Sequence, residues 1–352
     1  MTLPNVTTVG AHPDEDPTPR SSTGIKTDEG RRETIYSQTN VPSLIPIETR
    51  KKIDMRFSFK SFAIASMATL VLGTPVPRVQ SLSRRAESPT FPTTTQGAIA
   101  GLNNWDCKPS QEHPNALVLV HALFPNDIIN WFYMAPKFIA EGYCVFSLSY
   151  GAMNNQTVLF GLDSMETSAQ QLADFIDRVL AATNTNQVDI LGQSEGSLMP
   201  RYYLKHLGGA PKVHKFAGIS SIQYGTTLDG LTKVLAPSVS YDSIKESFDS
   251  ICRSCPQLLV DSPFLKELNE GGDTVPGVQY LMIGSRLDLI VTPYTNGFLK
   301  DKNPNVRNQI LQDWCATDMS EHIFQSFDPL VFAGVHAFFT PSANQSLSCL
   351  DY

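Results

Sequence analysis

The chain has 352 residues and lacks several features that would assign it to common classes of protein. Charged residues make up only 17% of it, the formal net charge is −7, and no cluster of lysine or arginine occurs in the part expected to fold. Nucleic-acid binding needs a basic surface, so we expect no nucleic-acid partner. No apolar run reaches the about 20 residues that a transmembrane helix requires, and no internal repeat is visible. The 41% of hydrophobic residues instead indicates a globular protein with a sizeable core.

Residues 1–54 are rich in proline, hydroxyl and charged residues, so we expect either a disordered or a mis-annotated N-terminal extension. Residues 55–73 have the basic start and short apolar core of a secretory signal peptide, although they are internal in this numbering. Translation from Met55 is the favoured explanation, and a poor internal signal anchor is the alternative. Residues 74–89 are predicted to be a propeptide or linker, and Arg84-Arg85 within them resembles a site of propeptide removal or is a plain charge pair. A single folded domain at 90–352 would follow.

Metal-ligand spacing is scarce in this chain. Cys252 and Cys255 have the spacing of a zinc or redox motif, but no second Cys/His pair and no thioredoxin-like βαβ pattern accompanies them. We therefore expect no metal and no cofactor. An even number of cysteines in an exported chain indicates disulfides, with many pairings possible; they are Cys107, Cys144, Cys252, Cys255, Cys315 and Cys349. Asn155 and Asn344 begin potential glycosylation motifs in such a chain.

From Ala116 onward, short apolar runs alternate with helical patterns, which is typical of an α/β fold. We expect a mostly parallel, doubly wound sheet with helices on both faces. The predicted strands are residues 117–120, 143–150, 188–191, 215–220 and 278–284, and the predicted helices are 126–140, with Asn126 as N-cap, 165–182, 197–207 and 328–339. Residues 231–276 break the alternation and are expected to hold a small cap region.

A predicted strand and a predicted helix flank the pentapeptide Gly192-Gln193-Ser194-Glu195-Gly196. Glycines two residues to either side of a serine let a strand and a helix approach closely, and the sharp turn between them exposes the serine hydroxyl. An ordinary glycine-rich turn is the alternative, but the flanking pattern favours a nucleophile. Ser194 is therefore the predicted nucleophile.

A serine hydroxyl needs a base, and the base needs an orienting acid; in this arrangement the chain order is serine, acid, histidine. His206 and His214 come too early for that order, and His336 lies in an apolar helical pattern typical of a packed core. His322 lies in a loop-like stretch, where functional residues are common, and is the predicted base.

Asp288 is the predicted acid because it follows the strand at 278–284, at the carboxyl edge where α/β sites are built. No strand directs the alternatives, which are Asp261, Asp273, Asp313 and Asp318.

An oxyanion hole needs two backbone N–H groups. Glu195, directly after the nucleophile, is expected to supply one, and either Leu123 or Ala122 in the loop after the first strand is expected to supply the other. His121 opens this loop and precedes the serine, so we expect it to shape the loop rather than to act as the base.

Together these segments resemble the class 2 lipases, secreted triacylglycerol lipases and esterases of the α/β-hydrolase superfamily. The resemblance runs from about Trp105 to Cys349 and is carried by residues 104–110, 142–146, 192–203, 225–230, 269–278, 288–294 and 312–322. It implies an α/β-hydrolase fold, a triad of Ser194, Asp288 and His322, and hydrolysis of carboxylic esters through an acyl-enzyme. It also implies three disulfides, which are Cys107 with Cys144, Cys252 with Cys255, and Cys315 with Cys349.

Two departures from the family pattern bear on the substrate. The family usually has His-Gly-Thr-Phe after the first strand, so the threonine hydroxyl that could serve the oxyanion is absent from His121-Ala122-Leu123-Phe124. The family elbow usually reads Gly-His-Ser-Gln-Gly-Gly, whereas Gln193, Glu195 and Ser197 occur here. A carboxylate beside an oxyanion is unfavourable unless it points away or is protonated. Our hypothesis is that Glu195 slows hydrolysis at neutral pH or changes the substrate preference.

The leading function is therefore a secreted, monomeric hydrolase of triacylglycerol or other lipid esters, acting without a cofactor and in contact with a lipid–water interface. Acyl transfer to an alcohol by the same triad is chemically adjacent. A non-catalytic binding protein of the same fold is an alternative of another class, suggested by the altered oxyanion loop.

Overall fold

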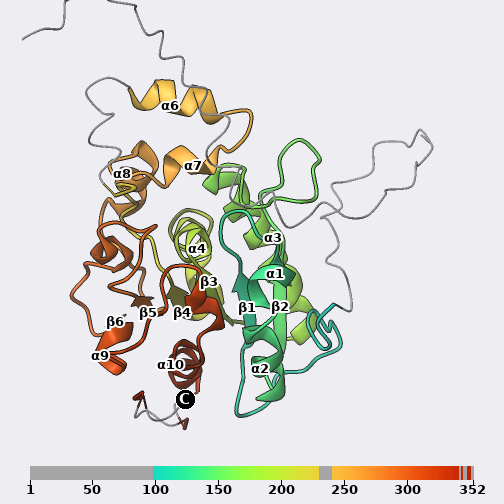
Figure 1. Cartoon of the computed structure of the whole chain (residues 1–352). Coiled ribbons are helices and arrows are strands. Elements are labelled where there is room, and N and C mark those ends of the chain that lie inside the picture. Colours follow the sequence, from blue (N-terminus) through green and yellow to red (C-terminus); the bar gives the residue numbers. More distant parts are fainter. Residues whose placement is uncertain (1–97, 230–239, 341, 344–346, 350–352) are drawn as a thin grey trace, which may run out of the picture. The chain divides into compact units, whose positions relative to one another are not determined.

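Six parallel strands form the centre of the computed structural model, which describes residues 98–229, 240–340, 342–343 and 347–349 (Figure 1). The strands lie in the order β2-β1-β3-β4-β5-β6. Their bounds are β1 Ala116–Val120, β2 Val145–Leu148, β3 Val188–Gln193, β4 Val213–Ile219, β5 Gln279–Gly284 and β6 Val306–Ile310. The predictions for residues 1–54, 55–73 and 74–89 and for Asn344 fall outside the described residues.

Helices cover both faces of this sheet, as a parallel sheet requires because its strands are apolar on both sides. Side chains that alternate along β1 enter two core clusters: Val118 and Val120 belong to one, Leu117 and Leu119 to the other. Helices α3 (Met165–Thr183), α4 (Glu195–His206) and α8 (Pro263–Asn269) complete the first cluster, and α1 (Asp127–Trp131), α2 (Met134–Ala140), α9 (Leu311–Trp314) and α10 (Pro329–Phe339) complete the second. The predicted parallel, doubly wound α/β sheet is confirmed.

The single helix predicted at 126–140 is wrong, because two helices occupy that segment. Helix α1 ends at Trp131 and α2 begins at Met134. Pro136 explains the break: in a continuous helix its ring would clash with the carbonyl of Phe132, whereas in the first turn of a new helix it is tolerated. The predicted N-cap of α1 is confirmed, since the Asn126 side chain accepts a hydrogen bond from the Ile129 N–H at 2.8 Å.

Strand β6 was not predicted. It pairs with β5 at the edge of the sheet, and Arg307 and Asn308 in its middle are exposed. An edge strand of this kind carries little of the apolar pattern by which the other strands were found. Short 3₁₀ helices complete the described elements: η2 Ala210–Lys212, η3 Tyr294–Gly297 and η4 Phe324–Phe327.

Three helices occupy the segment predicted as a cap, of which residues 231–239 fall outside the described part. They are α6 (Tyr241–Phe248), α7 (Ser254–Gln257) and α8, and Figure 1 shows α6 beyond α7 and α8 as seen from the sheet. Helix α6 buries none of its residues, whereas α8 buries Phe264, Leu265 and Leu268. Helix α8 is therefore packed into the core, whereas α6 lies on the surface of this segment.

Three disulfides join the cysteines in the pairs that the family resemblance implies: Cys107 with Cys144, Cys252 with Cys255, and Cys315 with Cys349. The first joins the segment before β1 to the start of β2. The second closes the turn between α6 and α7, and the third joins the segment after α9 to the C-terminal end of the described residues. No helix in the described ranges is long and apolar enough to span a membrane.

Candidate active site

The site lies where the chain leaves the middle of the sheet in two directions. From β1 the chain passes to β2 on one side, and β3 lies on the other side of β1. At such a switch point the loops after adjacent strands diverge and leave a crevice at the carboxyl edge. The loop that begins at His121 follows β1, and Ser194 follows β3, so both predicted segments meet at this edge.

Ser194 lies on a strained turn between β3 and α4, with φ 53° and ψ −117°. The flanking glycines are required by contact with backbone atoms. A Cβ on Gly192 would lie 1.8 Å from the Gly196 carbonyl oxygen, and one on Gly196 would lie 2.2 Å from the Val120 carbonyl oxygen. Because backbone atoms cannot move aside as a flexible side chain can, the elbow geometry depends on glycine at both positions.

The three predicted triad residues form one chain of hydrogen bonds. His322 Nε2 lies 2.9 Å from Ser194 Oγ, and His322 Nδ1 lies 2.8 Å from Asp288 Oδ2. All three side chains are buried. The structure therefore brings together residues that are far apart in the sequence, in the geometry that serine nucleophiles require.

The loop after β5 holds Asp288 in the orientation that His322 needs. Asp288 Oδ1 accepts hydrogen bonds from the backbone N–H groups of Ile290, at 2.9 Å, and Val291, at 2.8 Å. Its other oxygen, Oδ2, is thereby left facing Nδ1 of His322. The two backbone donors fix the carboxyl plane, so Asp288 is well placed to orient the histidine.

The alternative acids and histidines have other partners. Asp273 pairs with buried Arg201, Asp313 pairs with exposed Arg286, Asp318 accepts the Ser320 N–H, and Asp261 is exposed. His206 packs against Tyr202, His214 lies beside Asp189, and His336 packs among Phe138, Tyr143 and Phe332. The expectation of a packed core histidine at 336 agrees with these ring contacts, and burial lowers its pKa.

The structure distinguishes the two candidate oxyanion donors after β1. The Ala122 N–H donates to Asn130 Oδ1 at 3.0 Å, so it is not available to a substrate. The Leu123 N–H donates to no acceptor among the described residues. These contacts favour Leu123 over Ala122, and its role as an oxyanion donor stays a prediction.

His121 fixes the direction of the Leu123 N–H. Its Nδ1 donates to the Ala122 carbonyl at 2.7 Å, and in a trans peptide the carbonyl and the next N–H point in opposite directions. His121 Nε2 accepts the Tyr150 N–H at 3.1 Å, and complete burial lowers the pKa of His121 to about 4. The ring is therefore a neutral imidazole that shapes the loop, as its position in the sequence predicted.

Glu195 supplies its backbone to the site and buries its side chain away from water. It is the first residue of α4, and its N–H has no acceptor within the helix. Its carboxyl is completely buried, with Oε1 only 3.0 Å from the position that a Cβ on Gly161 would occupy. Desolvation raises its pKa well above the usual value, which favours the neutral acid over the carboxylate. The hypothesis that Glu195 slows hydrolysis at neutral pH or changes the substrate preference stays a prediction.

Two positions that sequence reasoning missed hold the backbone of the base. Ser220 Oγ donates to the His322 carbonyl, and the Ser220 N–H donates to Gln325 Oε1 at 3.0 Å. Ser220 is the last residue of a predicted strand, and this position at the carboxyl edge of the sheet could have indicated a role in the site. Gln325 gave no such signal, because its role depends on the path of the chain after His322.

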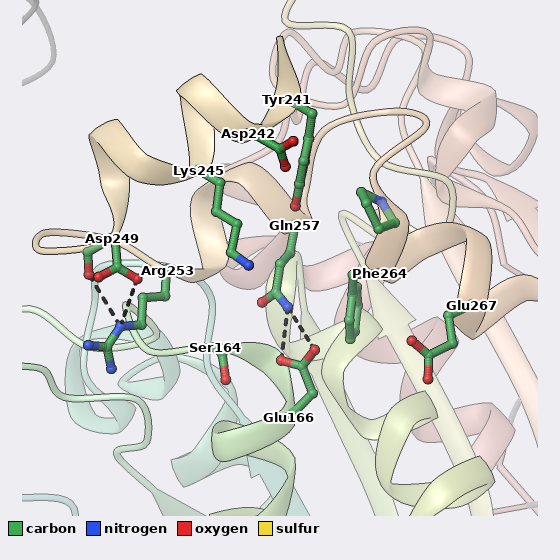
Figure 2. Close-up of a pocket in the computed structure, with 11 residues that line it drawn as sticks. Ser164, Glu166, Tyr241, Asp242, Lys245, Asp249, Arg253, Gln257, Phe264 and Glu267 are labelled. Atoms are coloured by element: carbon green, nitrogen blue, oxygen red, sulfur yellow. Dashed lines mark hydrogen bonds and ion pairs between the residues drawn. The ribbon is translucent and has the colours of Figure 1, made fainter.

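A separate cavity of about 310 Å³ lies beside α6, and Figure 2 shows the side chains that surround it. Its lining includes Glu166, Asp242, Lys245, Arg253 and Glu267, and none of the triad residues. Gln257 donates to both carboxylate oxygens of Glu166, at 3.0 and 2.8 Å. The charged lining makes this cavity unsuitable for an acyl chain.

A serine on a strand-to-helix elbow, hydrogen-bonded to a histidine and an aspartate at the carboxyl edge of a parallel sheet, defines the class of α/β-hydrolases. Within that class, residues 114–326 match the model of the family Lipase (class 2), and the chain belongs to this family. A comparison with curated protein sequences gave no significant match.

Solved structures of low sequence identity are also similar to this chain. Lipase B of Aspergillus fumigatus is 18% identical, with a TM-score of 0.48, over 75% of this chain and 62% of that one. The mature form of the Bacillus licheniformis lipase BlEst2 is 16% identical, with a TM-score of 0.46, over 66% of this chain and 94% of that one. Naproxen esterase of Bacillus subtilis is 16% identical, with a TM-score of 0.40, over 66% and 85%. The chain thus spans about three fifths of the length of the Aspergillus fumigatus lipase.

Proposed function

We propose that this protein is an exported serine hydrolase that cleaves carboxylic esters of lipids through an acyl-enzyme on Ser194. The observation that carries the proposal is the continuous hydrogen bonding from Ser194 through His322 to Asp288. A non-catalytic binding protein would have no need for a strained serine aligned with a base and an acid. The geometry is equally compatible with transfer of the acyl group to water or to another alcohol.

The mechanism follows from the positions of these atoms. His322 Nε2 takes the proton of Ser194 Oγ as the serine attacks the ester carbonyl, and Asp288 stabilises the imidazolium that forms. The N–H groups of Leu123 and Glu195 bind the oxygen on which negative charge develops. The imidazolium returns its proton to the departing alcohol, which leaves an ester on Ser194. Water activated by His322 then attacks this ester and releases the acid.

Lipid substrates are supported by the distribution of exposed apolar side chains. All the exposed large hydrophobic side chains among the described residues belong to segments that follow the carboxyl ends of strands or to the stretch around His322. They are Phe124, Ile129, Phe132, Val158, Leu159, Leu228, Ile251, Leu287, Leu289, Ile290, Met319, Ile323 and Phe324. We call these residues the apolar rim. Exposed apolar side chains gathered at one edge favour contact with a lipid surface.

Export is supported by the three disulfides, because such bonds persist in oxidising compartments. The signal-like segment at 55–73 adds to this support from the sequence. N-terminal sequencing of secreted protein tests export, and a mature chain that retains Met1 would contradict it.

Labelling with a fluorophosphonate tests the nucleophile. We expect the wild-type protein to be labelled at Ser194 and a Ser194→Ala variant of equal thermal stability to remain unlabelled. A series of p-nitrophenyl esters of increasing chain length then measures the acyl preference. Folded wild-type protein that stays unlabelled and hydrolyses no ester would favour a binding protein instead.

A further inference from the structure

Two buried amide side chains connect the oxyanion loop to the catalytic histidine. The Ala122 N–H donates to Asn130 Oδ1 at 3.0 Å, and Asn130 Nδ2 donates to Gln193 Oε1 at 2.8 Å. Gln193 Nε2 donates to the His322 carbonyl at 3.3 Å and to the Ile323 carbonyl at 3.4 Å. We call the connection from Ala122 through Asn130 and Gln193 to His322 the amide relay. It joins the loop after β1 to the loop that carries the base.

The ends of the amide relay determine the orientation of both side chains. A backbone N–H can only donate and a carbonyl can only accept. Ala122 therefore requires an oxygen from Asn130, which turns the Asn130 amide nitrogen toward Gln193. His322 likewise requires a nitrogen from Gln193, which turns the Gln193 oxygen toward Asn130. The donors thus all run in one direction, and neither amide can flip without breaking contacts at both of its ends.

The amide relay contacts the backbone beside both the expected oxyanion donor, the Leu123 N–H, and the base, His322. At one end it holds the Ala122 N–H, which belongs to the peptide before the one that presents the Leu123 N–H. His121 Nδ1 holds the Ala122 carbonyl of that second peptide, so the two successive peptides around Ala122 are each held by a side chain. At the other end it shares the His322 carbonyl with Ser220 Oγ. Asn130 and Gln193 are each only 4% exposed, so water does not compete for their hydrogen bonds.

We propose that Asn130 and Gln193 are positioning residues that hold the Leu123 oxyanion donor and the His322 base in mutual register. This proposal rests on the proposed function of Ser194. Loss of either amide loosens groups that act in the transition state rather than in substrate binding, so it lowers kcat and leaves KM nearly unchanged.

Substitutions of the two buried amide side chains, with a matched control at another buried asparagine, test the amide relay. Asn130→Leu and Gln193→Met should lower kcat for a p-nitrophenyl ester by about 10- to 100-fold, with KM within about twofold of wild type. Asn103→Leu is the matched control, because Asn103 is also buried and hydrogen-bonds to both backbone groups of Ser147 in β2. Its thermal stability should fall as that of Asn130→Leu does, but its kcat should remain that of wild type.

The variant Gln193→Glu should show a pH dependence of kcat that a purely structural role of Gln193 would not produce. A protonated glutamic acid can donate to the His322 carbonyl, whereas an ionised one turns an acceptor toward it. The ratio of variant kcat to wild-type kcat should therefore rise as the pH falls.

Two further measurements keep the amide relay separable from the ester activity. The rate at which a fluorophosphonate labels Ser194 should fall in Asn130→Leu and Gln193→Met, even if no ester tried is a substrate of the wild type. The NMR signal of the His322 Nδ1 proton should shift in both variants, whether or not Ser194 is labelled. The proposal is overturned if kcat or labelling rate stays within twofold of wild type and the His322 signal does not move.

Discussion

At the scale of the residue, the backbone and the side chain of Glu195 have separate roles. Its backbone N–H opens α4 beside the nucleophile, while its carboxyl is buried near Gly161. Ser254, next to the disulfide between Cys252 and Cys255, donates to the Gly161 carbonyl at 2.6 Å. This hydrogen bond holds in place the segment that covers the Glu195 carboxyl. Burial of the Glu195 carboxyl favours its neutral form, which adds no charge to the oxyanion hole.

We expect Glu195→Gln to change stability with pH rather than catalysis. In the unfolded chain a glutamate ionises near a pKa of about 4.3, whereas burial holds the folded pKa well above that. The unfolded state therefore binds fewer protons between the two pKa values, and wild-type stability falls as the pH rises through this window. The variant lacks this loss, so its thermal midpoint should exceed that of wild type by a margin that grows from pH 5 to pH 8.

The matching difference in the free energy of unfolding between the variant and wild type should increase by at most about 1.4 kcal/mol per pH unit. Ester hydrolysis should remain near the wild-type rate, because the backbone donor is unchanged. Glu246→Gln on the exposed face of α6 is the control and should show no such margin. Parallel stability curves for wild type and Glu195→Gln would contradict a neutral Glu195.

At the scale of the element, a buried ion pair connects α4 to the segment before β5. Arg201 in α4 and Asp273 pair at 3.3 Å, and both side chains are 1% exposed. Asp273 also accepts the Tyr224 hydroxyl at 2.6 Å and the backbone N–H of Asp301 at 3.3 Å. Arg201 also donates to the Asp273 backbone carbonyl at 2.9 Å and to Gln223 Oε1 at 3.1 Å, so the ion pair is the charged part of a network that holds the helix after the nucleophile.

Asp273→Ala should therefore lower the free energy of unfolding by about 3–5 kcal/mol, because it leaves the Arg201 guanidinium buried and unpaired. Urea unfolding measures the loss. Asp313→Ala removes the partner of an exposed arginine, Arg286, and should leave the unfolding midpoint near that of wild type. Equal midpoints for the two variants would show that the buried pair contributes no more than a surface one.

The elements and the triad could be predicted from the sequence where local signals determine them. The elbow at Ser194 and the strand before Asp288 are both marked by nearby residues. The choice between Ala122 and Leu123 could not be made, because it depends on the side chain of Asn130 in another element. The raised pKa of Glu195 depends on burial by segments that are distant in the sequence. Strand β6 could not be predicted because its exposed residues do not form an apolar pattern.

At the scale of the whole molecule, the apolar rim predicts that activity depends on the physical state of the substrate. Leu289 and Met319 are 76% and 77% exposed in solution. Each contributes about 1.5–3 kcal/mol when fully buried in an apolar medium. Leu289→Ser and Met319→Ser should each lower hydrolysis of emulsified triacylglycerol by about tenfold or more.

Hydrolysis of a short, dissolved p-nitrophenyl ester should be unaffected, because it requires no docking to a surface. Glu141→Ser, at the C-terminal end of α2 and outside the apolar rim, should change neither rate. Equal losses on emulsified and dissolved substrates would assign these side chains to the catalytic pocket rather than to a lipid surface.

The disulfide between Cys315 and Cys349 joins the stretch that carries His322 to the C-terminal end of the described residues. Cys315 precedes His322 in the same stretch of chain, and its partner follows all three triad residues in the order of synthesis. The bond forms only after the ribosome has made Cys349 and the chain has met an oxidant. The covalent link on the stretch that carries His322 can therefore form only after every residue of the candidate triad has been synthesised.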